Sequence, residues 1–267
     1  MSVDVLTSQL TGRLLPRANP LSKLFAAVLV TLVVMLSIDW VSAAVVLGSE
    51  LLLLPLLGIS AWQLLKRTWP LVVAAMVAAY GTALLAEKTG AVLLEVGPIL
   101  FTQDSVNSGI AIGLRGLAIA LPGIFLLTTT DPTDLADALA QRLRLPHRFV
   151  LGALAGLRLV GLLVDEWRTL GLARHARGVG FEGNPVARLK NFLGQGFGLI
   201  VQAIRRATRL AVAMEARGFG AGDRTWARES TFSLLDLWVC LTGILIAGAA
   251  VMAAVLAGTW NFLLGAS

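Results

Sequence analysis

Charged residues are scarce in this sequence: they occupy 14% of its 267 positions, whereas apolar residues occupy 57%. A soluble domain carries roughly 25% charged residues, so this composition excludes an ordinary soluble fold and predicts an integral membrane protein. The formal net charge is +6, but no aromatic-rich basic stripe accompanies it. We therefore expect a lipid bilayer as one partner and no nucleic acid.

Residues that carry chemistry are also few. The single cysteine, Cys240, lies inside a hydrophobic run, so it can form no internal disulfide. His147 and His175 have no neighbours at metal-ligand spacing. The chain lacks a Gly-Lys-Ser/Thr phosphate loop, and the adjacent carboxylates Asp165 and Glu166 point to different faces of a helix. These absences predict no metal, no cofactor, no catalytic residues and no ATP binding by this chain.

Long hydrophobic runs, in contrast, are plentiful. Five of them approach the ~20 residues that cross a ~30 Å hydrocarbon core. They cover about residues 21–38, 41–60, 71–86, 106–129 and 232–256. A further stretch, residues 92–101, is partly apolar, and its re-entry into the membrane is an alternative that would change the number of spans by one. The composition thus predicts about five transmembrane helices in the cell membrane.

Basic residues indicate how these spans are oriented. Arg13, Arg17 and Lys23 flank the first run, and Lys66 and Arg67 join the second to the third. The alternate loops contain almost no basic residues. By the positive-inside rule, the N-terminus is cytoplasmic and the C-terminus, after an odd number of spans, lies outside.

The segment between the fourth and fifth runs differs in kind. Asp131 and Pro132 predict a helix start, and two long amphipathic runs follow at about 148–177 and 187–217. The second run carries a regular apolar stripe, namely Leu193, Phe197, Ile200, Ile204, Ala207, Ala211 and Met214. The expected fold is an all-α integral membrane protein with a cytoplasmic domain of long amphipathic helices before the last span. The expected domains are 1–130, 131–222 and 223–267.

Both long runs end in the same way. One closes with Ala176-Arg177-Gly178 and the other with Ala216-Arg217-Gly218. A glycine just past a helix commonly ends it in the left-handed conformation, and a cation suits the last turn, so two ordinary C-caps are one interpretation. The other is that each guanidinium binds a partner. Arg174 shares a face with Arg177 and is an alternative contact at the first end.

Two charges lie within the hydrophobic runs. Glu50 is near the middle of the second run, and Arg115 lies at a similar depth in the fourth. A lone charge near the bilayer centre costs roughly 3 kcal/mol, so we expect these residues to form a structural ion pair. A substrate or proton site is the alternative.

At this point the sequence resembles a known family, the transmembrane T components (EcfT/CbiQ-type) of energy-coupling factor (ECF) transporters. The resemblance covers nearly the whole chain. The matching elements are Pro20-Leu21-Ser22-Lys23-Leu24, Thr130-Asp131-Pro132, Leu143-Arg144-Leu145-Pro146 and the two Ala-Arg-Gly triplets.

The resemblance implies a non-catalytic coupling subunit. In the family, two cytoplasmic ABC-type ATPases hydrolyse ATP, and a small membrane protein, the S component, captures a vitamin or a transition-metal ion. Each Ala-Arg-Gly triplet docks on one ATPase. Carried over, Arg177 would bind one ATPase and Arg217 the other, and the long helices would pack their apolar stripes against each other and the S component.

Two other functions stay open from the residues alone. A permease subunit of a conventional ABC importer would couple through one cytoplasmic helix instead of two. A self-contained secondary transporter or membrane-embedded enzyme would need polar residues clustered at the bilayer midplane, where only Glu50 and Arg115 come close.

Overall fold

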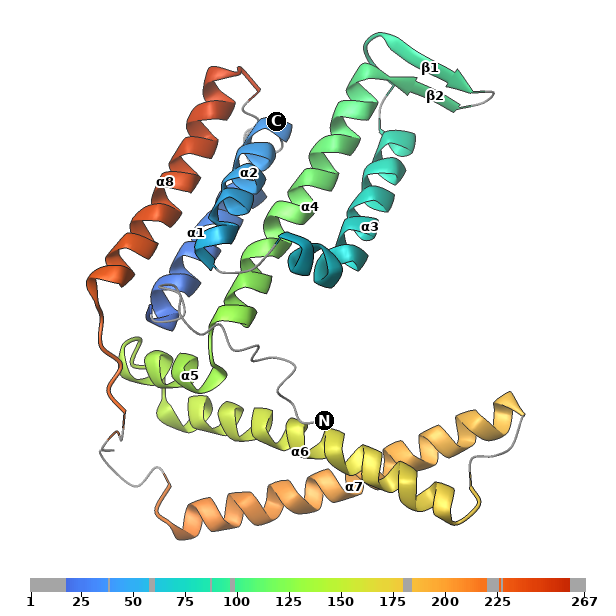
Figure 1. Cartoon of the computed structure of the whole chain (residues 1–267), viewed down its shortest axis with the longest axis vertical. Helices are drawn as coiled ribbons and strands as arrows, with labels where there is room; N and C mark the ends of the chain where they lie inside the picture. Colours follow the sequence, from blue (N-terminus) through green and yellow to red (C-terminus); the bar gives the residue numbers. More distant parts are fainter. Residues whose placement is uncertain are drawn as a thin grey trace. The chain divides into compact units, whose positions relative to one another are not determined.

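A computed structural model describes residues 18–37, 39–57, 61–86, 88–96, 99–179, 184–219, 226 and 228–259. The predicted all-α membrane fold is confirmed: these residues form eight helices and one strand pair (Figure 1). The chain divides into two compact units. Residues 136–230 form one, which we call the helix-pair unit. Residues up to 135 and from 231 form the other, which we call the membrane unit.

Five apolar helices build the membrane unit. They are α1 (Pro20–Leu36), α2 (Trp40–Leu57), α3 (Ala61–Leu85), α4 (Gln103–Thr129) and α8 (Leu234–Leu256). Three stretches are long and apolar enough to cross a bilayer, namely Thr68–Leu85, Gln103–Thr129 and Leu234–Leu256. Helices α1 and α2 are apolar but shorter, so the number of spans remains a prediction.

Helix α3 begins earlier than the sequence indicated. We expected Lys66 and Arg67 in a connector ending at Pro70, but all three lie inside α3. Proline removes only one internal hydrogen bond, so the helix continues through it. The apolar part of α3 begins at Thr68, which leaves both cations in its first turns.

A β-hairpin joins α3 to α4, where the sequence indicated only a partly apolar loop. Strands β1 (Val92–Val96) and β2 (Ile99–Thr102) pair antiparallel. The second strand runs directly into α4, because Thr102 is the N-cap of that helix. The Thr102 N–H donates to Ser105 Oγ at 3.0 Å and the Ser105 N–H donates to Thr102 Oγ1 at 3.4 Å. This capping box sets the start of α4.

Small residues let the helices of the membrane unit approach closely. A Cβ at Gly109 would lie 2.5 Å from the Ala79 carbonyl oxygen, and one at Gly243 would lie 2.7 Å from the Ala26 Cβ. Close backbone approach at small residues is typical of helix pairs in membranes. The main apolar core lies among these helices and comprises Val30, Val34, Val46, Ala118 and Ala250.

A buried polar cluster joins three helix ends in the membrane unit. We call it the α1–α4–α8 cluster; it comprises Asn19, Ser22, Lys23, Thr129 and Asp236. The Asp236 carboxylate accepts the Asn19 N–H and, at 3.0 Å, the Ser22 hydroxyl. Lys23 Nζ donates to the Thr129 carbonyl at 2.9 Å. Each of the five side chains is less than 9% exposed. The cluster therefore ties the start of α1 and the start of α8 to the end of α4.

The helix-pair unit is dominated by two long helices. They are α6 (His147–Ala176) and α7 (Pro185–Ala216), preceded by the short α5 (Pro132–Gln141), which begins in the membrane unit. Asn184 caps α7, since its side chain accepts the Val186 N–H at 3.0 Å. A small core of Ala136, Ala140 and Val150 holds α5 against α6.

Candidate functional site: the ends of the paired helices

The first Ala-Arg-Gly triplet ends α6 in a Schellman motif. Gly178 has a φ of +77°, in the left-handed region that glycine enters without steric cost. The Val179 N–H donates to the Arg174 carbonyl and the Gly178 N–H to the His175 carbonyl, both at 3.0 Å. These two bonds are the 6→1 and 5→2 bonds of the motif, with Arg177 as the C-cap.

The second triplet ends α7 with the same geometry. Gly218 has a φ of +74°, and Arg217 is the C-cap. The two bonds recur as Phe219 N–H to Met214 carbonyl at 3.0 Å and Gly218 N–H to Glu215 carbonyl at 2.9 Å. The backbone angles of the two arginines agree closely: φ −90° and ψ 8° for Arg177, φ −90° and ψ 10° for Arg217. The repeated sequence thus produces one local structure twice.

Both C-cap arginines are exposed. Within the residues that the structure describes, neither guanidinium makes a hydrogen bond or an ion pair. Their donors are free for a partner that carries carboxylates or backbone carbonyls.

Arg174, the alternative contact at the first end, is occupied instead. Its Nη1 donates to the Asn191 carbonyl of α7 at 2.6 Å, and its guanidinium lies against Gly194. Arg174 therefore fastens α6 to α7, and Arg177 is the arginine available at this end.

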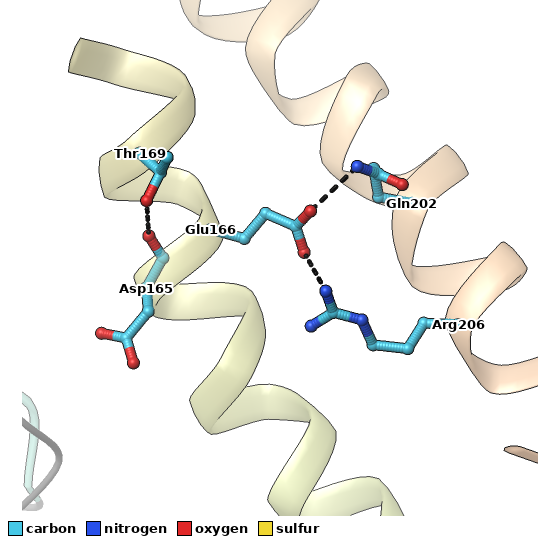
Figure 2. A network of polar contacts seen from close by, with 5 residues as sticks. All are labelled: Asp165, Glu166, Thr169, Gln202 and Arg206. Atoms are coloured by element: carbon cyan, nitrogen blue, oxygen red, sulfur yellow. Dashed lines mark hydrogen bonds and ion pairs between the residues drawn. The ribbon is translucent and has the colours of Figure 1, made fainter. Parts of the chain in front are cut away.

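Polar contacts join α6 to α7. The Glu166 carboxylate accepts a hydrogen bond from Gln202 Nε2 at 2.9 Å and pairs with Arg206 at 3.3 Å, as Figure 2 shows. Gln195 Nε2 donates to the Trp167 carbonyl at 2.7 Å. Glu166 itself is half-buried, so its ion pair is less screened than a surface pair.

These contacts show that α6 and α7 run antiparallel. Residues later in α6 meet residues earlier in α7, and the two helices cross (Figure 1). Their C-terminal ends, with Arg177 and Arg217, consequently lie at opposite ends of the pair. A helix of 30 residues, the length of α6, spans roughly 45 Å.

The prediction that the apolar stripes of the two long helices pack against each other is wrong. On α7, Leu193, Phe197, Ile200 and Ile204 are between 58% and 70% exposed. Glutamate, glutamine and arginine side chains make the contact with α6 instead, together with Trp167, whose ring meets that of Phe192 edge-on with 5.1 Å between the centroids. The stripe on α7 is left as an open apolar surface.

A groove of about 630 Å³ lies beside the second end, between the first half of α6 and the last half of α7. Its lining comprises Leu151, Leu154, Ala155, Arg158, Leu159, Leu162, Arg206, Leu210, Met214, Arg217, Gly218 and Phe219. The sequence did not indicate this groove, because its walls come from positions about 60 residues apart that only the antiparallel pairing brings together.

The predicted ion pair between Glu50 and Arg115 does not form. Arg115 donates to the Met35 carbonyl, one of the last of α1, where a cation satisfies an acceptor without an intrahelical partner. Glu50 is 4% exposed, and among the described residues neither of its carboxylate oxygens has a hydrogen-bond partner. Across the described part of the chain, no three His, Cys, Asp or Glu side chains gather as a metal site would require.

The sequence analysis missed the role of Asp236. Lys23 and Asp236 are charged residues at the beginnings of the first and last apolar runs. Their placement was the one feature of the sequence that could have indicated a polar contact there. Sequence alone did not indicate that α1 and α8 are neighbours, so it did not bring the two residues together.

Comparison with known proteins agrees with the resemblance. A family described as "CbiQ: Cobalt transport protein" matches residues 11–226. The energy-coupling factor transporter transmembrane protein EcfT of Brevibacillus brevis is 32% identical over 245 residues, which cover 87% of this chain and 91% of that protein. The EcfT of Streptococcus equi subsp. equi is 30% identical over 240 residues, which cover 84% and 89%.

Proposed function

The chain belongs to the CbiQ/EcfT family of transmembrane components of energy-coupling factor transporters, and from that membership we propose that it couples ATP hydrolysis to substrate uptake. In this role it catalyses nothing itself. Two cytoplasmic ABC-type ATPases, identical or different, hydrolyse ATP, and one S component binds a vitamin or a transition-metal ion. The observation that carries the proposal is the pair of identical arginine caps at opposite ends of α6 and α7.

Two ATPases need two separate attachment points, and the antiparallel pair provides them. Arg177 binds one ATPase and Arg217 the other. The ends are roughly 45 Å apart by helix length, and Glu166, Gln202 and Arg206 hold the helices together between them. A movement of the ATPases toward each other therefore acts on both ends of a connected pair.

The open stripe on α7 supports a contact with the S component. Leu193, Phe197, Ile200 and Ile204 form an apolar surface that α6 does not cover. Large exposed apolar surfaces mark interaction sites with proteins or membranes. In this arrangement α7 transmits ATPase movement to the protein that holds the substrate.

The orientation follows from the basic residues. The N-terminus, α6 and α7 are cytoplasmic, where the ATPases are, and the C-terminus is outside. A permease subunit of a conventional ABC importer is the second candidate, but it would use one coupling helix, and two matched ends favour the first. A secondary transporter or membrane enzyme is less well supported, because the two intramembrane charges do not form a shared site.

Charge reversal of the two caps tests the proposal. The Arg177→Glu/Arg217→Glu double variant should still insert in the membrane but lose the ATPases on purification in mild detergent. Truncating one partner of a buried charge pair costs about 2–5 kcal/mol, and reversal adds repulsion. The matched control is Arg205→Glu/Arg209→Glu, which changes the charge of α7 equally at exposed positions away from its cap. Stoichiometric ATPase in the cap variant would overturn the docking role.

A further inference from the structure

The two arginine ends are alike in backbone but differ in their surroundings. We propose that the groove beside Arg217 receives an apolar segment flanked by carboxylates, supplied by the ATPase that binds Arg217. This inference rests on the proposed function, and it adds a binding surface on the present chain that lies outside the Ala-Arg-Gly triplet. At the Arg177 end the ATPase contacts the exposed cap.

The floor of the groove is apolar. Leu159, Leu210 and Met214 are half-buried in its walls, as are further lining residues. A volume of about 630 Å³ lies within the range of specific binding pockets, roughly 300–1,000 Å³. It accommodates several apolar side chains, such as those of one helical turn.

The charge of the lining selects an acidic occupant. Three arginines line the groove, Arg158, Arg206 and Arg217, and none of the other described lining residues is charged. Arg206 is partly neutralised by Glu166 at 3.3 Å. Arg158 and Arg217 are exposed and have no partner within the described residues. Carboxylates on the occupant would form charge-assisted hydrogen bonds with these two guanidinium groups.

The cap itself explains why the ends differ. In a Schellman motif, the residue after the glycine packs against the residue three positions before the C-cap. At the second end these residues are Phe219 and Met214, and both line the groove. At the first end the equivalent residues are Val179 and Arg174, and Arg174 is turned to the Asn191 carbonyl. One apolar pair therefore widens the contact surface at Arg217 but not at Arg177.

A photo-crosslinking amino acid at Leu159 tests the occupant in the complete transporter. Leu159 lies in the groove, whereas Leu157 is 59% exposed on α6 and lies outside it. We expect an adduct with an ATPase subunit from position 159 and none from position 157. Adducts with lipid alone, with the S component alone, with an ATPase from both positions equally, or no adduct at all would overturn the proposal.

A charge variant measures the contribution of the groove. Arg158→Glu should speed ATPase dissociation roughly tenfold or more, since it places a carboxylate where the occupant carries its own. Arg205→Glu, an equal charge change at an exposed position outside the groove, should leave the dissociation rate unchanged. Equal rates in both variants would contradict the groove contact.

The outcomes separate this proposal from the one on which it rests. If the Arg177→Glu/Arg217→Glu variant keeps its ATPases, the docking role falls and the groove contact falls with it. If that variant loses them while Arg158→Glu binds normally and Leu159 captures no ATPase, only the groove contact is refuted.

Discussion

Arg177 and Arg217 owe their position to the glycine that follows each of them. Only a left-handed residue at that place completes the two closing hydrogen bonds, and the φ values of the two glycines are +77° and +74°. The cap ends the helix and leaves the arginine exposed at its last turn. The two interpretations of the triplet are thus compatible, because the same residues end the helix and present the arginine.

Replacing the glycine tests whether the cap geometry serves docking. Gly218→Ala should weaken ATPase binding at the Arg217 end, because a Cβ in the left-handed region costs about 1–2 kcal/mol and favours a different cap. Gly218→Asn should weaken binding less, since asparagine enters that region more readily. The measurement is ATPase affinity for each purified variant. Equal affinity in the alanine variant and the parent chain would show that the cap geometry is not needed.

At the scale of elements, the α1–α4–α8 cluster lies where the membrane unit connects to the rest of the chain. The chain leaves the membrane unit after α4 and returns to it before α8. Lys23 holds the end of α4 through the Thr129 carbonyl, and Asp236 holds the start of α1. Hydrogen bonds therefore hold both the end of α4 and the start of α8 against the same helix, α1.

Removing the carboxylate of Asp236 should destabilise this junction. Asp236→Ala leaves the buried Asn19 N–H and the part-buried Ser233 N–H without their acceptor, and each unsatisfied donor costs about 1–3 kcal/mol. The Ser22 hydroxyl keeps the Asn19 carbonyl as its acceptor at 2.7 Å. We expect a lower unfolding temperature in detergent. Asp104→Ala is the control, since Asp104 is also an acid in the first turn of an apolar helix but is exposed. Equal unfolding temperatures for the two variants would contradict the role of the cluster.

At the scale of the whole molecule, a carboxylate inside the apolar helix α2 would support an independent transporter, whereas the amphipathic helix pair α6–α7 supports a coupling subunit. Glu50 lies between Val46 and Leu54 on one face of α2, with buried apolar neighbours on both sides. It does not join Arg115 in a site that crosses between helices. The two exposed arginine caps and the open apolar stripe of α7 both lie in the helix-pair unit. Because these features suit a protein partner, they favour a coupling subunit over an independent transporter.

The orientation of the chain is open to a direct measurement. In a Cys240→Ala background, Thr259→Cys should react with a membrane-impermeant maleimide added to intact cells, because it follows α8 at the predicted outer end. Ser230→Cys, before α8, should react only after permeabilisation. Labelling in the opposite order would invert the predicted topology and place the arginine ends outside the cell.

Much of this architecture could be predicted from local pattern. Apolar runs long enough to cross a bilayer identified the helices of the membrane unit, and their amphipathic counterparts identified α6 and α7, with errors at the start of α3 and in the hairpin. The triplets indicated both caps, because a C-cap depends on residues within two turns of one helix.

Only the tertiary structure decided which residues from distant parts of the chain lie next to each other. The sequence by itself determined the membrane class, the helices and the paired arginine ends, since these depend on composition and short-range periodicity. Four further features depend on which helix faces meet: the hydrogen bond of Arg115, the apolar surroundings of Glu50, the contact of Arg174 with α7, and the groove beside Arg217. Helix crossing angle and rotation set those contacts, and they arise from packing between residues far apart in the chain.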